Sequence, residues 1–149
     1  MVELAVRDFK DAEVSRVEID RPPPSWFIDT LRELRAQTPM ETPLRFLIGA
    51  DQAASLHSWR EPQAILDLAQ PVIVMREPWT RAELRAEIAR RFPSLDEGAI
   101  DEWIINTDLL SVSSTEIRER VRDGKPIDRL VAPAVAQYIR ERGLYRRAT

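Results

Sequence analysis

Three consecutive hydroxyl side chains followed by an arginine form the pattern with the most chemistry in this sequence. They are Ser113, Ser114 and Thr115, with Arg118 three residues after the threonine. At the first turn of a helix, such hydroxyls add donors to the free backbone N–H groups, and Arg118 would point from the same face as Thr115. Arginine forks match phosphate oxygens, so the pattern favours a phosphate site. An ordinary Ser113 N-cap, with Glu116 completing a capping box, is the simpler alternative.

A second candidate site follows a short apolar run that ends in Ile48, Gly49, Ala50 and Asp51. A glycine directly after a buried strand lets a ligand approach the backbone, and the next helix offers its free N–H groups to an anion. Asp51 suits the N-cap of that helix and is also able to accept from a ribose hydroxyl. On these residues alone, a turn glycine with a capping aspartate is the favoured interpretation. Arg76, at the end of the next apolar run, is a weaker site candidate.

Trp59 and Arg60 form a third candidate, close behind the second. A tryptophan beside an arginine can stack on a heteroaromatic ring and supply positive charge. In the alternative, Trp59 only covers the core while Arg60 lies in solvent, and the sequence does not separate the two. His57, the single histidine, lies in a polar loop, where a histidine is more often solvent-exposed or structural than catalytic.

Strands alternating with helices are needed to bring these junctions together. Buried strands are predicted at 44–48, 71–75 and 103–105, and the alternation at 14–19 suggests another strand. Helices are predicted at 1–8, 26–36 with Ser25 as the N-cap, 80–92, 113–122 and 133–142, with Gly124 and Gly143 near the last two ends. This order indicates an α/β fold with a mostly parallel sheet, whose ligands bind beyond the carboxyl ends of the strands.

The composition excludes several classes of protein. With 149 residues, 44% hydrophobic and 32% charged, the chain is predicted to be one soluble, cytoplasmic domain, 1–149. No apolar run approaches the roughly 18 residues of a membrane helix, and no signal peptide is predicted at the start. The absence of cysteine and the single histidine exclude disulfides, thiolate sites and multi-histidine zinc sites. A net charge of −3 argues against a nucleic-acid partner.

Taken together, these residues resemble the bacterial nicotinate-nucleotide adenylyltransferases of the nucleotidyltransferase superfamily. The matching segments follow the family's order over nearly the whole chain. They are P-S-W-F-I-D-T-L at 24–31, F-L-I-G-A-D at 46–51, Trp59, V-M-R at 74–76, S-S-T-E-I-R at 113–118, V-A-Q-Y-I at 135–139 and G-L-Y at 143–145. S-S-T-x-I-R alone recurs across the superfamily, whereas its combination with I-G-A-D, the tryptophan and the terminal L-Y is specific.

The resemblance implies a Rossmann-like nucleotidyltransferase fold and a reaction of NAD biosynthesis. ATP and nicotinate mononucleotide would give nicotinate adenine dinucleotide and pyrophosphate, with Mg²⁺ on the pyrophosphate portion of ATP. By the same resemblance, Ser113, Ser114, Thr115 and Arg118 would hold the ATP phosphates. Ile48, Gly49, Asp51 and Arg76 would contact the nucleotide. Trp26, Phe27, Trp59 and Arg60 would surround the nicotinate ring, with the Arg60 backbone near its carboxylate.

The chain departs from the family in two places. The family usually has Tyr-Thr where this chain has Trp26-Phe27, and the lost threonine hydroxyl bears on the preference for acid over amide substrates. The family's G-x-F-x-P-x-H-x-x-H segment, whose histidines neutralise the ATP phosphates, is absent, so no catalytic residue is identified. The chain would then be the C-terminal two-thirds or so of the family domain, without its first two strands.

The missing strands predict open strand edges, which favour pairing with another chain, so a homo-oligomer is one expectation. Two other functions stay open at this point. One is a catalytically incomplete nucleotide-binding module, which would bind dinucleotide without turnover. The other is a sister adenylyltransferase that acts on a different phosphate-bearing acceptor.

Overall fold

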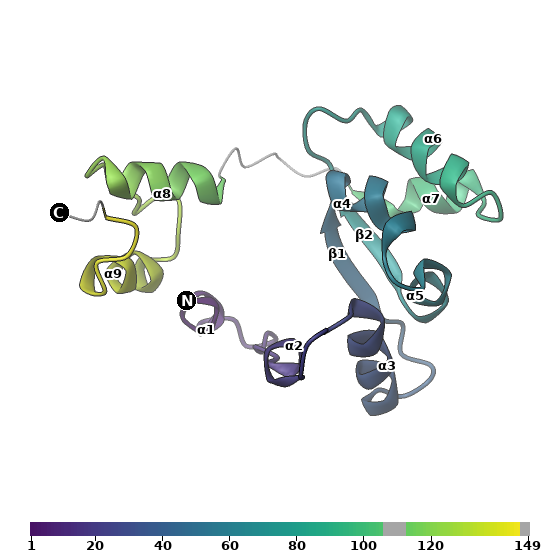
Figure 1. Cartoon of the computed structure of the whole chain (residues 1–149), viewed down its shortest axis with the longest axis horizontal. Helices are drawn as coiled ribbons and strands as arrows, with labels where there is room; N and C mark the ends of the chain where they lie inside the picture. The colour runs from purple at the N-terminus through teal and green to yellow at the C-terminus, as the bar shows by residue number, and fades with distance from the viewer. Residues whose placement is uncertain (106–112, 147–149) are drawn as a thin grey trace. The chain divides into compact units, whose positions relative to one another are not determined.

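The computed structural model describes residues 1–105 and 113–146, which belong to two compact units (Figure 1). We call Val17–Leu109 the sheet unit, and Met1–Arg16 together with Leu110–Thr149 the terminal unit. Each is described by itself below, and the single domain expected over 1–149 stays a prediction.

The sheet unit is built on a parallel sheet, as the sequence predicts. Its strands β1 (Arg45–Gly49), β2 (Gln70–Val74) and β3 (Ile104–Ile105) lie in the order β1-β2-β3. Gly49 lies opposite Val74 and Ile73 opposite Ile104, so the carboxyl ends of the strands meet at one edge. The predicted strands at 44–48 and 71–75 are confirmed to within one residue. The third begins one residue late, because Trp103 ends a helix instead of starting the strand.

The helices of this unit are α2 (Val17–Asp20), α3 (Phe27–Gln37), α4 (Ala50–Ser55), the 3-10 turn η1 (Leu56–Ser58), α5 (Pro62–Leu68), α6 (Arg81–Arg91) and α7 (Glu97–Trp103). Local side chains start two of them. The Thr80 hydroxyl accepts from the Glu83 N–H at 3.3 Å, and the Glu83 carboxylate accepts from the Thr80 N–H at 2.9 Å, so α6 begins in a capping box. Asp96 caps α7 by accepting from the Ala99 N–H at 3.0 Å.

The core of the sheet unit lies against one face of β1 and β2. Phe46 and Ile73 are 8% and 1% exposed, and Ile28, Ile65, Leu84 and Ile100 of the surrounding helices are fully buried. Leu47, on the opposite face of β1, is 69% exposed, and β1 pairs only with β2 among the described strands. This agrees with the open strand edge expected from the sequence, while the homo-oligomer stays a prediction.

The strand predicted at 14–19 is wrong. Val17–Asp20 forms α2, no regular structure is assigned to residues 14–16, and Ile19 is 72% exposed. A strand needs a neighbour to satisfy its backbone groups, and none of the described strands pairs with this segment. Glu18 instead accepts a hydrogen bond at 2.9 Å from the buried hydroxyl of Thr30 on α3, which a helical turn brings within reach.

The terminal unit packs α1 (Val2–Val6), α8 (Ser114–Arg122) and α9 (Pro133–Glu141) around a small core of their own. Its buried residues are Ile127, Val135, Ala136 and Ile139. Gly124 and Gly143 follow α8 and α9 in the left-handed region, with φ of 69° and 59°, as expected of residues that end helices. Across the residues described, no helix is long and apolar enough to cross a membrane.

Acid is expected to destabilise the sheet unit partly through Glu87. Arg90 and Arg91 donate to its carboxylate at 2.7 Å and 2.9 Å, and these hydrogen bonds lower the pKa of Glu87 to about 2 from an ordinary 4.5. A lowered folded-state pKa stabilises the fold above the unfolded pKa, and the stabilisation is lost as the pH falls toward 2. Between about pH 5 and 2, Glu87→Gln should therefore lose less stability than the wild type, measured by urea unfolding. Identical losses would contradict this role.

Candidate functional site

Four of the predicted residues gather in the sheet unit as a group that we call the aromatic cluster: Trp26, Phe27, Trp59 and Arg60. Trp59 meets Phe27 nearly edge to face, with ring centres 5.5 Å apart and an interplanar angle of 86°. Phe27 in turn lies 5.1 Å from the ring of Phe46 on β1. The Arg60 guanidinium carbon lies 5.5 Å from the centre of the Trp26 ring, within the range of a cation–π contact.

The two halves of the aromatic cluster come from the start of α3 and from the segment after η1. Trp26 is the N-cap residue of α3, in extended conformation, without a side-chain cap. The predicted Ser25 cap is therefore wrong, and the Ser25 hydroxyl accepts from Arg21 at 3.1 Å instead. Trp59 ends η1 by donating its backbone N–H to the Leu56 carbonyl at 3.0 Å.

A salt bridge links α3 to the segment that carries Trp59 and Arg60. The Arg32 guanidinium donates to the Glu61 carboxylate at 2.6 Å. This hydrogen bond lowers the pKa of Glu61 and raises the pKa of Arg32. Glu61 itself has a φ of 53° and precedes Pro62, the first residue of α5, so the chain turns sharply just after Arg60.

The structure matches the simpler interpretation of Trp59 and Arg60, and stacking on a ligand ring stays a prediction. Trp59 is half-buried and packs against the core, as the simpler alternative has it. Trp26 is 42% exposed and Arg60 is exposed, so an aromatic face and a positive charge remain accessible beside the core. One ring nitrogen of His57 lies 3.1 Å from the Ala54 carbonyl oxygen, at hydrogen-bond distance.

The second set of predicted residues lies at the carboxyl edge of the sheet. Ile48 and Gly49 end β1, and Arg76 follows the last residue of β2 by two positions. Apart from Gly49 and its two chain neighbours, no described residue has an atom within 4 Å of the place that a Cβ on Gly49 would take, so the strand end is open there. Gly49, not Asp51, is the N-cap residue of α4, so the capping role expected of Asp51 is wrong.

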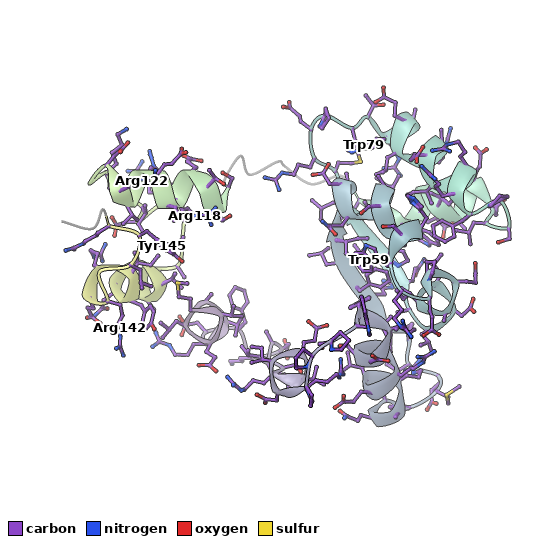
Figure 2. All side chains as sticks on the ribbon, viewed as in Figure 1. Trp59, Trp79, Arg118, Arg122, Arg142 and Tyr145 are labelled. Atoms are coloured by element: carbon purple, nitrogen blue, oxygen red, sulfur yellow. The ribbon has the colours of Figure 1, made fainter. Side chains whose placement is uncertain are left out.

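Asp51 has a different partner, which the sequence did not indicate. It is exposed in the first turn of α4 and accepts a hydrogen bond from the indole N–H of Trp79 at 3.2 Å. Figure 2 labels Trp79 in the sheet unit. The only signal for Trp79 in the sequence is its place shortly after a predicted strand, since its contact with Asp51 joins distant segments.

The hydroxyl cluster lies on the first turn of α8, as predicted. Ser113 is the N-cap, and its hydroxyl accepts from the Glu116 N–H at 3.0 Å. Arg118 donates to the Thr115 hydroxyl at 3.2 Å, which confirms that these two side chains share a face of the helix. Ser114 and Thr115 are both exposed, so one hydroxyl caps the helix and two stay available to a ligand.

An apolar cavity of about 360 Å³ lies beside the start of α8 in the terminal unit. Ser114 and Arg118 line it together with apolar side chains from α1, α8, α9 and the segment before α9, among them Ala5, Ile117, Val131 and Val135. Figure 2 labels Arg118 and Tyr145, which both line it. The cavity thus joins an apolar lining to hydroxyl and guanidinium donors.

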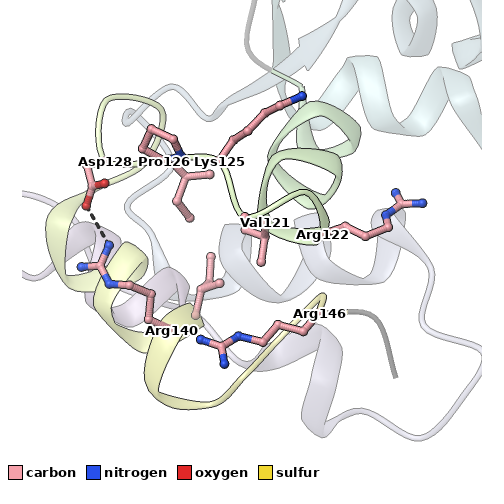
Figure 3. Close-up of a pocket in the computed structure, with 10 residues that line it drawn as sticks. Val121, Arg122, Lys125, Pro126, Asp128, Arg140 and Arg146 are labelled. Carbon is pink, nitrogen blue, oxygen red and sulfur yellow. Dashed lines mark hydrogen bonds and ion pairs between the residues drawn. The ribbon is translucent and has the colours of Figure 1, made fainter. Parts of the chain in front are cut away.

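A second cavity, of about 580 Å³, lies elsewhere in the terminal unit and contains none of the predicted residues (Figure 3). Arg140 donates to Asp128 at 2.8 Å, and Arg122 and Lys125 extend away from Val121. Arg122 and Arg140 lie in the last turns of α8 and α9, where positive charge stabilises a helix. Arg122 and Arg140 therefore have a role in their own helices that needs no ligand.

No family model matches the sequence. Curated relatives match nearly all of it. A probable nicotinate-nucleotide adenylyltransferase of Roseiflexus sp. (strain RS-1) is 43% identical over 98% of this chain and 70% of its own length. Proteins with the same name from Desulfitobacterium hafniense (strain Y51) and Yersinia pestis (strain Pestoides F) are 38% and 36% identical, over 98% of this chain and 69% and 70% of theirs.

A solved structure shares the fold. The nicotinic acid mononucleotide adenylyltransferase of Plasmodium falciparum, complexed with NaAD, matches with a TM-score of 0.54 at 21% identity. The match covers 80% of this chain and 56% of that one, so the chain spans little more than half of the solved protein. This likeness confirms the Rossmann-like nucleotidyltransferase fold expected from the sequence.

Proposed function

Because the chain belongs to the nicotinate-nucleotide adenylyltransferase family, we propose that it acts in adenylyl transfer from ATP to nicotinate mononucleotide. A phosphate oxygen of the mononucleotide attacks the α-phosphorus of ATP, and a new P–O bond forms there. The bond between the α-phosphorus and the bridging oxygen breaks, and pyrophosphate leaves with that oxygen. The step needs no protein nucleophile, so the residues act by positioning the substrates and neutralising charge.

The observation that carries this proposal, beside family membership, is the cavity at the start of α8. Its apolar lining suits an adenine ring, and Ser114 and Arg118 offer donors to phosphate oxygens beside it. Thr115 is held against Arg118, and free N–H groups of the first turn add their partial positive charge. We therefore assign ATP to this cavity, with its phosphates toward Arg118.

The aromatic cluster is proposed as the pyridine site. A nicotinate ring is flat and carries a carboxylate, and the cluster combines exposed aromatic surface at Trp26 with the positive charge of Arg60. In the same nucleotide, the open strand end at Gly49 leaves room for the phosphate to approach the backbone, and the Asp51 carboxylate would accept from a ribose hydroxyl. Arg76, exposed after β2, adds a positive charge at this edge.

Magnesium is proposed to arrive with ATP. Among the residues described, no three His, Cys, Asp or Glu side chains gather closely enough to hold a metal ion. A Mg²⁺ ion commonly keeps several waters and binds through substrate phosphates, so it needs no dedicated cage of protein ligands. When bound there, it would neutralise charge on the leaving pyrophosphate. A cytoplasmic location and a homo-oligomer stay predictions.

The proposal is tested by incubating the purified chain with ATP, Mg²⁺ and nicotinate mononucleotide, and separating the products by chromatography. We expect nicotinate adenine dinucleotide and pyrophosphate in equal amounts, and a calorimetric titration showing that the dinucleotide binds. Binding without product would favour the nucleotide-binding module. Product formed only with a different phosphate-bearing acceptor would favour the sister adenylyltransferase. The absence of both binding and product would overturn the proposal.

Replacing Arg60 by glutamine tests acid recognition. We expect the KM for nicotinate mononucleotide to rise about tenfold, which is the scale of one charge-assisted hydrogen bond. The KM for nicotinamide mononucleotide should change less than about twofold, because the amide carries no charge to lose. Arg45→Gln is the control, since it removes the same charge from an exposed position at the start of β1. An equal rise for the acid and amide substrates would contradict carboxylate recognition by this side chain.

A further inference from the structure

Arg21 makes a dense set of hydrogen bonds just ahead of the aromatic cluster. Its Nη1 donates to the Ser25 hydroxyl at 3.1 Å, to the Trp26 carbonyl at 3.4 Å and to the Thr30 hydroxyl at 3.0 Å. Its Nη2 donates to the Glu33 carboxylate at 3.0 Å. The side chain is only 17% exposed, although the proposed chemistry does not use it.

The Thr30 hydroxyl links Arg21 to Glu18. Its hydroxyl accepts from Arg21 and donates to Glu18 at 2.9 Å, and the residue is 6% exposed. A buried hydroxyl that both accepts and donates has its hydrogen-bonding capacity well used, so moving either partner leaves a polar group unsatisfied. Arg21 and Glu18 therefore hold the segment that includes α2 against the first turns of α3.

The backbone of Trp26 is part of the same arrangement. Its carbonyl accepts from Arg21 and also from the Asp29 and Thr30 N–H groups, at 3.0 Å and 3.4 Å, in the first turn of α3. Its neighbours Phe27 and Ile28 are anchored independently, by contact with Phe46 and by complete burial. Trp26 is 42% exposed, and its ring contacts the Arg60 guanidinium.

We propose that Arg21 is a positioning residue for pyridine recognition. It fixes the backbone from which the exposed Trp26 ring projects, and so holds that ring under the Arg60 guanidinium. The inference rests on the proposed function, because it assigns the pyridine to the aromatic cluster. Arg21 itself touches no substrate and acts through Trp26.

Arg21→Met tests the proposal, because methionine keeps the long apolar stem and removes every donor. We expect the KM for nicotinate mononucleotide to rise about tenfold, the scale of losing the charge-assisted contact of Arg60, which the Trp26 ring positions. The KM for ATP and kcat should stay within about twofold, because α8 and its cavity belong to the terminal unit. The KM of Arg21→Lys for nicotinate mononucleotide should fall between those of the wild type and Arg21→Met, because an ammonium lacks the planar fork that reaches several acceptors at once.

Arg35→Met is the matched control, on α3, the helix whose first turns Arg21 contacts. Arg35 donates to the Pro39 and Thr42 carbonyls at 3.1 Å and 2.8 Å, at the far end of α3 from Trp26. Its loss should lower stability about as much as Arg21→Met but leave both KM values within about twofold. If Arg35→Met raises the KM for nicotinate mononucleotide as far as Arg21→Met does, Arg21 is merely structural and the proposal is overturned.

A readout that needs no activity separates this inference from the proposed function. The indole N–H resonance of Trp26, assigned with Trp26→Phe, should shift in Arg21→Met and stay in place in Arg35→Met. An unmoved Trp26 resonance in Arg21→Met would overturn the positioning role even in an active protein. A shifted resonance in a chain that neither binds nor converts nicotinate mononucleotide would leave the positioning of Trp26 standing, and the proposed function would fail by itself.

Discussion

Replacing Arg118 by alanine is expected to weaken ATP binding about tenfold to a hundredfold. A guanidinium hydrogen-bonded to phosphate contributes about 1.5–3 kcal/mol, and about 1.4 kcal/mol corresponds to each factor of ten. Arg118 is exposed in the second turn of α8, lines the cavity assigned to ATP and donates to the Thr115 hydroxyl. The measurement is the Kd for ATP by calorimetry, together with the apparent KM for ATP.

Arg122→Ala is the matched control for this prediction. Arg122 ends the same helix and lines the other cavity of the terminal unit, so its removal takes the same charge from α8 without touching the proposed ATP site. We expect a change in Kd of less than about twofold, the scale of a screened surface charge. An unchanged ATP affinity in Arg118→Ala, or an equal loss in both variants, would count against the phosphate role.

Ile73→Ala is expected to destabilise the sheet unit by about 2–5 kcal/mol, the usual range for truncating a buried isoleucine. Ile73 is 1% exposed on β2, the middle strand, and lies opposite both Ile48 and Ile104. The cavity left by its side chain would lie between the sheet and the helices packed on it, so few neighbours can move in to fill it. Urea unfolding followed by tryptophan fluorescence measures the loss, since all four tryptophans belong to the sheet unit.

Leu47→Ala provides the comparison from the adjacent strand. Leu47 is also aliphatic and lies on β1, but it is 69% exposed on the face away from the core. We expect a loss below about 0.5 kcal/mol, as for most surface substitutions. A loss as large as that of Ile73→Ala would mean that another surface covers this face of β1 in solution, as the expected homo-oligomer would.

Local signals predicted much of the fold from the sequence. The apolar runs that become β1 and β2 are short, bounded by turn residues and buried along one face, and they were placed to within one residue. The start of α8 was equally clear in the sequence, because the Ser113 cap accepts from the N–H of Glu116, only three residues along the chain. Gly124 and Gly143 marked helix ends for the same reason, since their left-handed backbone is a local property.

The same local logic failed where a distant partner decides the outcome. The alternation at 14–19 looked like a strand, but Glu18 bonds to Thr30 and the segment turns into α2. Ser25 and Asp51 looked like helix caps, yet each side chain has a partner elsewhere: Arg21 for Ser25, and Trp79 for Asp51. A capping residue is recognised from its neighbours in the chain, whereas the bond of Asp51 to Trp79 joins residues 28 apart and forms only when separate elements pack together. Arg21 lies only four residues before Ser25 and competes locally for its hydroxyl.

The sequence by itself determined the family, the parallel strands and the hydroxyl-and-arginine start of α8, because these depend on residue type and short spacings. Only the tertiary structure brought Arg60 over Trp26, Trp59 against Phe27, and Arg21 onto the backbone of Trp26. The first two contacts join segments far apart in the chain, and the third depends on how α2 meets α3. Their geometry is therefore set by the packing of α3 and the η1 segment around the sheet, which no local pattern encodes.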